Sequence, residues 1–227
     1  MKTFAFIFAR GGSKGIRNKN LIKINNLTLL EHSILVAKNS KKIDQIIISS
    51  DSDKILRIAK KYDVLTIKRP IKLASDNSRE WDSWIHAVKQ ISRLYNFDLF
   101  ISLPTTSPLR KSVDINSSLD AFLKFRPDIL YTINESSKNP YFNMVVKNKN
   151  QIKKIIKNKP FFRRQDAPII YDLNTVAVVT KPNYILSSPH QFYGNVYGHI
   201  IPKIRSLDID THLDYKIAKL LMEKNVK

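Results

Sequence analysis

Residues 4–20 constrain the fold of this chain more than any other stretch, because an apolar run gives way within a few residues to glycines and cations. The stretch reads FAFIFARGGSKGIRNKN and contains no carboxylate. The apolar part is typical of a buried first strand, and the remainder predicts a phosphate-binding loop. Glycine allows positive φ and a close approach of the backbone to a ligand, and successive N–H groups of such a loop bind anions. The cations of this loop suit a polyphosphate: Arg10, Lys14, Arg17 and Lys19.

The glycine spacing separates this loop from two common phosphate loops. The Walker pattern ends in Gly-Lys-Ser/Thr, whereas here Lys14 precedes Gly15 and no hydroxyl residue follows it. The dinucleotide pattern Gly-x-Gly-x-x-Gly is absent as well. We therefore expect a phosphate site of another kind, and a solvated basic turn is the alternative.

The rest of the chain alternates between strand-like and helix-like patterns, which is typical of a mainly parallel sheet covered by helices. At 227 residues the chain is long enough for one α/β domain spanning 1–227. The expected helices cover residues 29–38, 54–62, 81–91 and 113–125, with a last helix from about residue 211. The expected later strands cover residues 45–50, 64–67, 99–103, 129–133, 175–180 and 196–201.

Ligands of open parallel sheets bind outside the carboxyl ends of the strands. Four loops leave those ends here, at residues 10–20, 49–53, 69–76 and 104–110. All four are polar, charged or rich in glycine or proline. We therefore expect these loops to line one rim, with the ligand between them.

Residues 139–168 interrupt the alternation. They contain two short strand-like pieces separated by basic turns, followed by a Pro-flanked segment of basic and aromatic residues. We interpret this segment as a hairpin excursion that covers a site or reaches a partner subunit. The alternative is a plain surface insertion.

Asp208 and Asp210 lie in the segment SLDIDTHLD, between the last strand and the last helix. In extended backbone alternate side chains point the same way, so both carboxylates face one side across Ile209. Two such oxygen ligands can hold a Mg²⁺ that keeps several waters and bridges to phosphate. The alternative is a helix cap, since Thr211-x-x-Asp214 resembles a capping box. Beside a polyphosphate loop, we favour the metal site.

The chain has 39 Lys and Arg against 19 Asp and Glu, a formal net charge of +20. Clustered cations would indicate nucleic-acid binding, but these lysines are scattered over helices and loops, with one denser run at residues 147–159. An AT-rich genome would produce the same bias toward Lys, Asn and Ile. We therefore expect no nucleic-acid partner.

The sequence lacks cysteines, a signal peptide and a membrane-spanning stretch, and these features bear on where the protein is found. The chain has no cysteine, which excludes disulfides and thiolate metal sites. The N-terminal apolar run is short, is closed by Arg10 and lacks a small-residue cleavage site, so it is typical of a strand and not of a signal peptide. No later stretch is long enough to span a bilayer. We expect a cytoplasmic protein without membrane contact.

Five motifs in chain order resemble those of the acylneuraminate cytidylyltransferases, also called CMP-sialic acid synthetases. The motifs are ARGGSKGIRNKNL, RPIKLASDNS, TSPLR, RRQDAP and LDIDTHLD, and the resemblance runs from about residue 3 to residue 222. Enzymes of this family join CTP to a nonulosonic acid, such as N-acetylneuraminic, legionaminic or pseudaminic acid, and release pyrophosphate. The resemblance implies a Rossmann-like nucleotidyltransferase sheet with helices on both faces, the same reaction, Mg²⁺ as cofactor and a homodimer.

The resemblance also implies roles for individual residues. Triphosphate-binding and catalytic roles fall on Arg10, Lys14 and Lys19. Further nucleotide contacts fall on Gly11, Gly12, Ser13, Asn20, Arg69, Ala74, Asp76 and Ser78. The sugar side is assigned to Pro104, Thr105, Thr106, Arg164, Gln165 and Asn174, and the metal pair to Asp208 and Asp210. Residues 139–168 match the dimerisation lobe of the family, which reaches across to the site of the other subunit.

Pro104 departs from the family pattern. Members that use N-acetylneuraminic acid commonly read Leu-Gln-Pro-Thr-Ser-Pro-Leu-Arg where this chain reads LPTTSPLR, so a sugar-contacting Gln is missing. A pocket built to hydrogen-bond one substituent strongly rejects analogues that lack it. We therefore hypothesise a nonulosonic acid other than N-acetylneuraminate. Thr175 follows Asn174 where glycine is frequent, a smaller departure on the same side.

Three other functions remain open at this point. The nearest is a cytidylyltransferase for 3-deoxy-manno-octulosonate or an 8-amino relative, although that branch usually opens with a different loop. A non-catalytic nucleotide-binding protein would show no Mg²⁺-dependent turnover. A nucleic-acid-binding module would show duplex affinity that falls steeply with salt, in competition with CTP.

Overall fold

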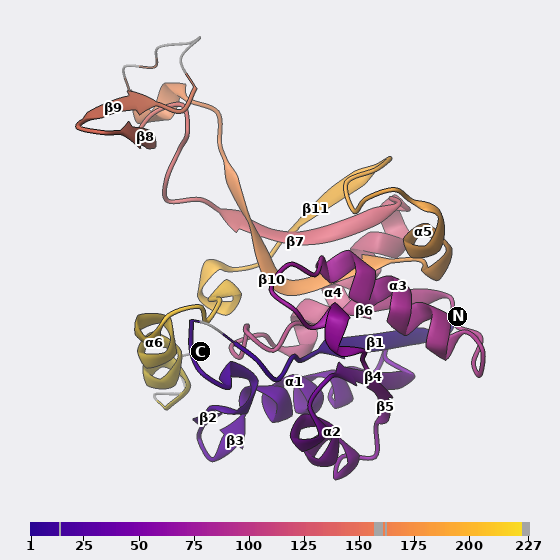
Figure 1. Cartoon of the computed structure of the whole chain (residues 1–227). Helices are drawn as coiled ribbons and strands as arrows, with labels where there is room; N and C mark the ends of the chain where they lie inside the picture. Colours follow the sequence, from indigo (N-terminus) through magenta and orange to yellow (C-terminus); the bar gives the residue numbers. More distant parts are fainter. Residues whose placement is uncertain (14, 157–160, 162, 224–227) are drawn as a thin grey trace.

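A central sheet of seven strands carries helices on both faces (Figure 1). The computed structural model describes residues 1–13, 15–156, 161 and 163–223. The strand order is β11-β7-β10-β6-β1-β4-β5. Within the described part of the chain, β10 runs antiparallel to β6 and β7, and the other neighbouring strands of this sheet pair in parallel. The expected mainly parallel α/β sheet is therefore confirmed.

The observed elements follow the predicted alternation closely. The sheet contains β1 (Thr3–Phe8), β4 (Gln45–Ser50), β5 (Leu65–Lys68), β6 (Leu99–Ser102), β7 (Ile129–Glu135), β10 (Tyr171–Thr180) and β11 (Val196–Ile200). The helices are α1 (Leu29–Lys38), α2 (Asp53–Lys60), α3 (Glu80–Ile91), α4 (Ser112–Phe125), α5 (Pro182–Ser187) and α6 (His212–Glu223). Two small hairpins lie outside the sheet, β2 (Lys23–Ile24) with β3 (Leu27–Thr28) and β8 (Val145–Asn148) with β9 (Gln151–Lys154). Among these elements, α5 and the β2–β3 hairpin were not expected from the sequence. None of the helices in the described part of the chain is both long and apolar enough to cross a membrane.

The alternation of side chains along β1 explains the two helical layers. Phe4 and Phe6 pack with Trp84 of α3 and with α5, whereas Ala5 and Ile7 pack with α1, α2 and α4. Successive side chains of a strand point to opposite faces, so a continuous apolar run buries both. The sheet is therefore held between two cores, and only its strand ends can present polar groups to a ligand.

A third, smaller core fixes the basic loop near the C-terminal helix. Ile16 from the loop packs with Ile209, which lies between the two aspartates, and with Ala218 of α6. Ile209 is fully buried. The basic loop and the Asp-x-Asp segment are thus joined by apolar contact although they lie near opposite ends of the chain.

Strands β7 and β10 extend beyond the sheet and carry the hairpin lobe, which is made of residues 136–170 (Figure 1). Their pairing shifts between Leu173 and Val178, where β10 contains extra residues. The side chain of Thr132 fills this irregularity, since its Oγ1 accepts from Ala177 N and donates to Ala177 O, both at 2.9 Å. Asn174 and Thr175 lie within the shifted stretch, so the irregularity sets where they project.

The β8–β9 hairpin of the lobe buries none of its own residues. It forms a separate two-stranded sheet in which all residues are exposed. The two short strands expected within residues 139–168 are confirmed as β8 and β9, while residues 157–160 and 162 of that segment lie outside the described residues.

Candidate active site

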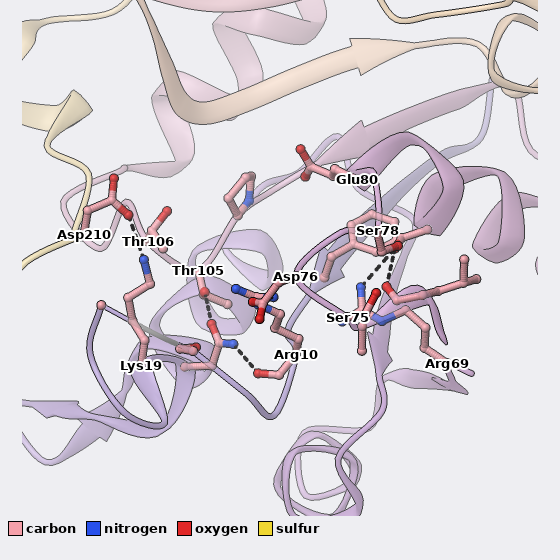
Figure 2. A pocket seen from close by; sticks show the side chains of 18 residues that line it. Arg10, Lys19, Arg69, Ser75, Asp76, Ser78, Glu80, Thr105, Thr106 and Asp210 are labelled. Atoms are coloured by element: carbon pink, nitrogen blue, oxygen red, sulfur yellow. Dashed lines mark hydrogen bonds and ion pairs between the residues drawn. The ribbon is translucent and has the colours of Figure 1, made fainter. Parts of the chain in front are cut away.

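A pocket of about 580 Å³ lies at the carboxyl ends of β1, β5 and β6 (Figure 2). Three of the four loops predicted to form one rim line it directly, at residues 10–20, 69–76 and 104–110. The fourth contributes Asp51 from beneath, because its carboxylate accepts a hydrogen bond from Gly11 N at 2.9 Å. The chain order therefore places the pocket where parallel sheets bind ligands.

Most of the predicted site residues meet at this pocket. The lining includes Arg10, Ser13, Lys19, Asn20, Arg69, Ala74, Asp76, Ser78, Pro104, Thr105, Thr106 and Asp210. Gly12 lines a smaller adjoining pocket, and Lys14 lies outside the described residues. Gly11, Asn174 and Asp208 do not line this pocket. Arg164 and Gln165 lie on the lobe, in the short 3-10 turn η3 (Arg164–Asp166).

Asn20 fixes the shape of the basic loop. Its Nδ2 donates to the carbonyl of Arg10 at 2.8 Å, and its Oδ1 accepts from Thr105 Oγ1. Asn20 is buried, so these hydrogen bonds are shielded from water. The loop is thereby tied to the end of β6 before any ligand arrives.

The glycines of the loop act differently from the sequence-based expectation. Among the described glycines only Gly194 has positive φ, and the left-handed residue of the loop is Asn18, with φ 54°. Asparagine tolerates this conformation better than most residues. Gly15 serves close packing instead, because a Cβ there would lie 2.6 Å from the carbonyl oxygen of Asp210. A Cβ at Gly12 would meet nothing within 4 Å.

Lys19 joins the loop to the aspartate segment. Its Nζ donates to Asp210 Oδ1 and to the carbonyl of Ile209, both at 2.8 Å (Figure 2). On the other wall, Arg10 Nη1 lies 2.9 Å from Asp76 Oδ1. Each cation thus has a carboxylate partner that an anionic ligand can replace.

Arg69 lines the pocket but is largely buried. Its guanidinium lies 3.8 Å from Asp51 Oδ1 and donates to Ser83 Oγ at 3.3 Å. Burial lowers the pKa of Arg69, and the neighbouring Asp51 opposes that shift. Ser83 in turn donates to the carbonyl of Leu73 at 3.1 Å, which holds the 69–76 loop against α3.

Asp208 has the properties of an incomplete ligand site. Burial is the main cause that raises the pKa of its carboxyl, and the nearby Asp210 raises it further. Its Oδ1 is buried and has no hydrogen-bond partner among the described residues. A buried unpaired carboxylate oxygen is costly unless a cation or donor satisfies it. The donor set of Asp208 and Asp210 fits a hard divalent cation that takes its other ligands from water and phosphate.

The helix-cap alternative accounts for other residues of the same segment. Thr211 Oγ1 accepts from Asp214 N at 3.3 Å, and Asp214 Oδ2 accepts from Thr211 N at 2.7 Å. This is a reciprocal capping box for α6. The cap uses Thr211 and Asp214, so the carboxylates of Asp208 and Asp210 remain available. No group of three or more His, Asp or Glu side chains suited to a metal occurs in the described part of the chain.

A hydroxyl cluster links the 104–110 loop to β10. Thr175 Oγ1 lies 2.7 Å from Ser107 Oγ and accepts from Thr106 Oγ1 at 3.3 Å. Thr175, the residue that departs from the family pattern, therefore makes contacts that glycine could not make. Asn174 Nδ2 donates to Asn134 Oδ1 at 3.1 Å, which orients it at the base of the lobe.

Arg110, the last residue of the 104–110 loop, was not singled out from the sequence. It is buried, donates to the carbonyl of Val176 at 2.7 Å and to Ser33 Oγ at 3.0 Å, and has no carboxylate within ion-pair distance among the described residues. Burial lowers its pKa to about 10. Arg110 satisfies carbonyls that the irregularity of β10 leaves free. Asp51, Ser83 and Glu80 were missed as well, and only the position of Asp51 at a strand end could have indicated it.

A mainly parallel sheet with a basic loop and an Asp-x-Asp segment joined at its strand ends is typical of a nucleotidyltransferase-type α/β protein. The sequence profile of the family described as "Cytidylyltransferase" matches residues 4–225. The chain belongs to this family. The resemblance drawn from the five sequence motifs is thereby confirmed.

Two relatives align over almost the whole chain. "Post-translational flagellin modification protein B" of Campylobacter coli is 37% identical, with 97% of this chain and 95% of the relative covered. "CMP-N,N'-diacetyllegionaminic acid synthase" of Campylobacter jejuni is 36% identical, with 95% and 93% covered. The Escherichia coli "N-acylneuraminate cytidylyltransferase" is 26% identical, and this chain covers 52% of its length.

The fold also matches solved structures at low sequence identity. The CMP:2-keto-3-deoxy-manno-octonic acid synthetase, solved in complex with CTP, has a TM-score of 0.76 and 14% identity, with both chains covered completely. The 4-diphosphocytidyl-2C-methyl-D-erythritol synthase from Anaerococcus prevotii has a TM-score of 0.67 and 15% identity, with 98% of this chain and 96% of that chain covered. These likenesses establish the Rossmann-like nucleotidyltransferase fold.

We predict that Gly15→Ala weakens the site while Gly12→Ala does not. The new methyl group of Gly15→Ala would collide with the Asp210 carbonyl and push the loop away from residues 209–210, which breaks the contacts of Lys19. We expect a loss of about 1–3 kcal/mol in the free energy of unfolding, typical of overpacking, and weaker CTP binding. Calorimetry with CTP and thermal unfolding check this prediction. Equal behaviour of the two variants would contradict it.

Proposed function

We propose that this protein transfers the cytidylyl group of CTP to a nonulosonic acid, in a Mg²⁺-dependent reaction that releases pyrophosphate. The observation that carries the proposal is the meeting of the basic loop, Arg69 and the Asp208–Asp210 segment around one pocket. Membership of the cytidylyltransferase family supports the nucleotide, and the activities for which the Campylobacter jejuni and Escherichia coli relatives are named support the sugar class. Since the reaction consumes CTP, we also propose a cytoplasmic location.

The charges of the pocket suit this reaction. The anomeric hydroxyl of the sugar would attack the α-phosphorus of CTP in line, forming a new O–P bond as the bond to pyrophosphate breaks. Positioning and charge stabilisation account for most of the catalysis in such transfers. Lys19 would stabilise the charge that develops on the α-phosphate, and Arg10, with Lys14, would hold the leaving pyrophosphate.

Asp208 and Asp210 would hold the cation. When bound, a Mg²⁺ ion supplies positive charge to the phosphate oxygens and fixes their geometry. The unpaired Oδ1 of Asp208 and its raised pKa support this assignment. Lys19, which donates to Asp210, would keep that carboxylate oriented in the free protein.

Pro104 supports a sugar other than N-acetylneuraminate. It lines the pocket beside Thr105 and Thr106 and offers neither a side-chain amide nor a backbone N–H. A legionaminic-type acid is our preferred substrate, because the relative named as a diacetyllegionaminic acid synthase is 36% identical whereas the Escherichia coli N-acylneuraminate cytidylyltransferase is 26% identical. A 3-deoxy-manno-octulosonate substrate remains the alternative.

Pyrophosphate release tests the proposed function directly. Each of the four NTPs is incubated with Mg²⁺ and with legionaminic, pseudaminic, N-acetylneuraminic or 3-deoxy-manno-octulosonic acid. We expect release with CTP and a legionaminic-type acid, and little with N-acetylneuraminic acid. A clear preference for N-acetylneuraminic acid would contradict the sugar assignment. Release with no pair, despite measurable CTP binding, would favour a non-catalytic nucleotide-binding protein.

We predict that Asp208→Asn raises the Mg²⁺ concentration needed for half-maximal turnover. The increase should reach about tenfold or more, since even outer-shell partners of a metal cost that much when removed. Binding of Mn²⁺ followed by electron paramagnetic resonance gives a readout independent of turnover. Asp120→Asn is the control, because Asp120 pairs with Lys42 and does not line the pocket, so its replacement should leave the metal titration unchanged. An unchanged metal titration in Asp208→Asn would leave the pair without a metal role.

We propose further that the lobe of residues 136–170 joins two chains into a dimer and brings Arg164 and Gln165 to the pocket of the partner. Several apolar side chains of the lobe support a protein contact, among them Val146, 52% exposed, and Ile152, 67% exposed. Arg164 lies on this lobe and does not line the pocket of its own chain. In the proposed dimer, Arg164 and Gln165 would contact the sugar in the pocket of the partner chain.

Sedimentation equilibrium checks the dimer. We expect the wild-type chain to be dimeric and a Val146→Lys, Ile152→Lys double variant to dissociate, because paired buried lysines are costly to desolvate. Leu94→Lys is the control, since Leu94 is 75% exposed on the main domain. A monomeric wild-type chain with full activity would contradict the proposal.

A further inference from the structure

Glu80 is a carboxylate that faces the pocket without a role in the proposed chemistry. It is the first residue of α3 and lines the pocket together with Pro104 and Arg69. Figure 2 shows its carboxylate at the upper side of the pocket, extending away from Arg69 and Ser75 toward the side on which Thr106 and Asp210 lie. The side chain is exposed to the cavity.

The electrostatic neighbours of Glu80 place it on the β7 side of the pocket. Its charge contributes to the raised pKa of Tyr131, a residue of β7, and on the other side it opposes the fall in the pKa of Arg69. Desolvation by the surrounding protein raises the pKa of Glu80 itself, although a hydrogen bond with the Trp84 indole and the charge of Arg69 act against that shift. Thr106, one of the residues assigned to the sugar, lines the same pocket as Glu80.

The position of Glu80 in the first turn of α3 does not by itself account for this carboxylate. An acidic residue in the first turn of a helix stabilises the helix dipole, but Asp82 in the same turn already supplies that charge and pairs with Arg79 at 2.8 Å. Glu80 has no ion-pair partner among the residues that the structure describes. Both substrates of the proposed reaction are anions, so a carboxylate in their pocket opposes binding unless it accepts a hydrogen bond from a neutral donor.

We propose that Glu80 determines sugar specificity by accepting a hydrogen bond from the N–H of an N-acylamino substituent. This inference rests on the proposed function and deepens it by naming the N-acylamino group as the substituent that the enzyme recognises. Pro104, on the same pocket wall, offers no amide, so the recognition of that substituent falls to another polar side chain. The charge of Glu80 also turns the sugar's own carboxylate toward the cationic side of the pocket, where Lys19 and Arg10 lie.

Kinetics of Glu80→Gln and Glu80→Ala test the inference. Pyrophosphate release is measured with CTP and N,N'-diacetyllegionaminic acid, and in parallel with 3-deoxy-manno-octulosonic acid, which has no N-acyl group. We expect kcat/KM for the diacetylated sugar to fall about tenfold or more, the scale of a charged hydrogen bond. The KM for CTP and the low rate with the unsubstituted sugar should both stay unchanged. Asp82→Asn is the matched control, since Asp82 does not line the pocket, and it should leave sugar selectivity unchanged.

Each other outcome overturns the inference in a distinguishable way. Equal losses with both sugars would make Glu80 part of the common chemistry, and a raised KM for CTP would place it against the nucleotide. Unaltered kinetics in Glu80→Gln and Glu80→Ala, with an active wild-type enzyme, would refute the inference and leave the proposed function intact. A wild-type chain that releases pyrophosphate with no sugar would overturn the proposed function and this inference with it.

Discussion

The contact between the basic loop and the aspartate segment is the constraint on which the pocket depends. Lys19 reaches Asp210 and the Ile209 carbonyl across 190 residues of sequence, and Gly15 packs directly on the same backbone. Ile16 and Ile209 add a small apolar core beneath this contact. The contact brings the cations of the basic loop together with the aspartate segment, an arrangement that neither end of the chain could form alone.

Internal ion pairs prepare the pocket for an anionic ligand. In the free protein Arg10 pairs with Asp76, and Lys19 with Asp210. The pairs hold the long cationic side chains in place, so less conformational entropy is lost when a triphosphate binds. Replacement of a carboxylate by phosphate keeps each cation compensated. Asp210 would then be released toward a bound cation, which couples the nucleotide to the metal.

The sequence predicted those features that follow from local pattern. The apolar run of β1 and the polar strand ends were sufficient to place the rim, because alternation and the parallel order determine which ends meet. The pattern could not show that β10 is reversed within the sheet or that its pairing with β7 shifts between Leu173 and Val178. Arg110 was missed for this reason, since its partners are backbone carbonyls that are freed only by the shift. The role of Gly15 was likewise hidden, because it depends on a contact with Asp210.

The Asp-x-Asp segment shows how two competing interpretations of one motif can both apply. Thr211 and Asp214 cap α6, and the cap fixes the direction in which the preceding residues enter the helix. That direction buries Ile209 and leaves Asp210 lining the pocket, with the largely buried Asp208 two residues before it. The cap therefore positions the carboxylates and does not compete with them. Because Thr211 and Asp214 alone cap α6, the carboxylates of Asp208 and Asp210 stay available to bind a ligand.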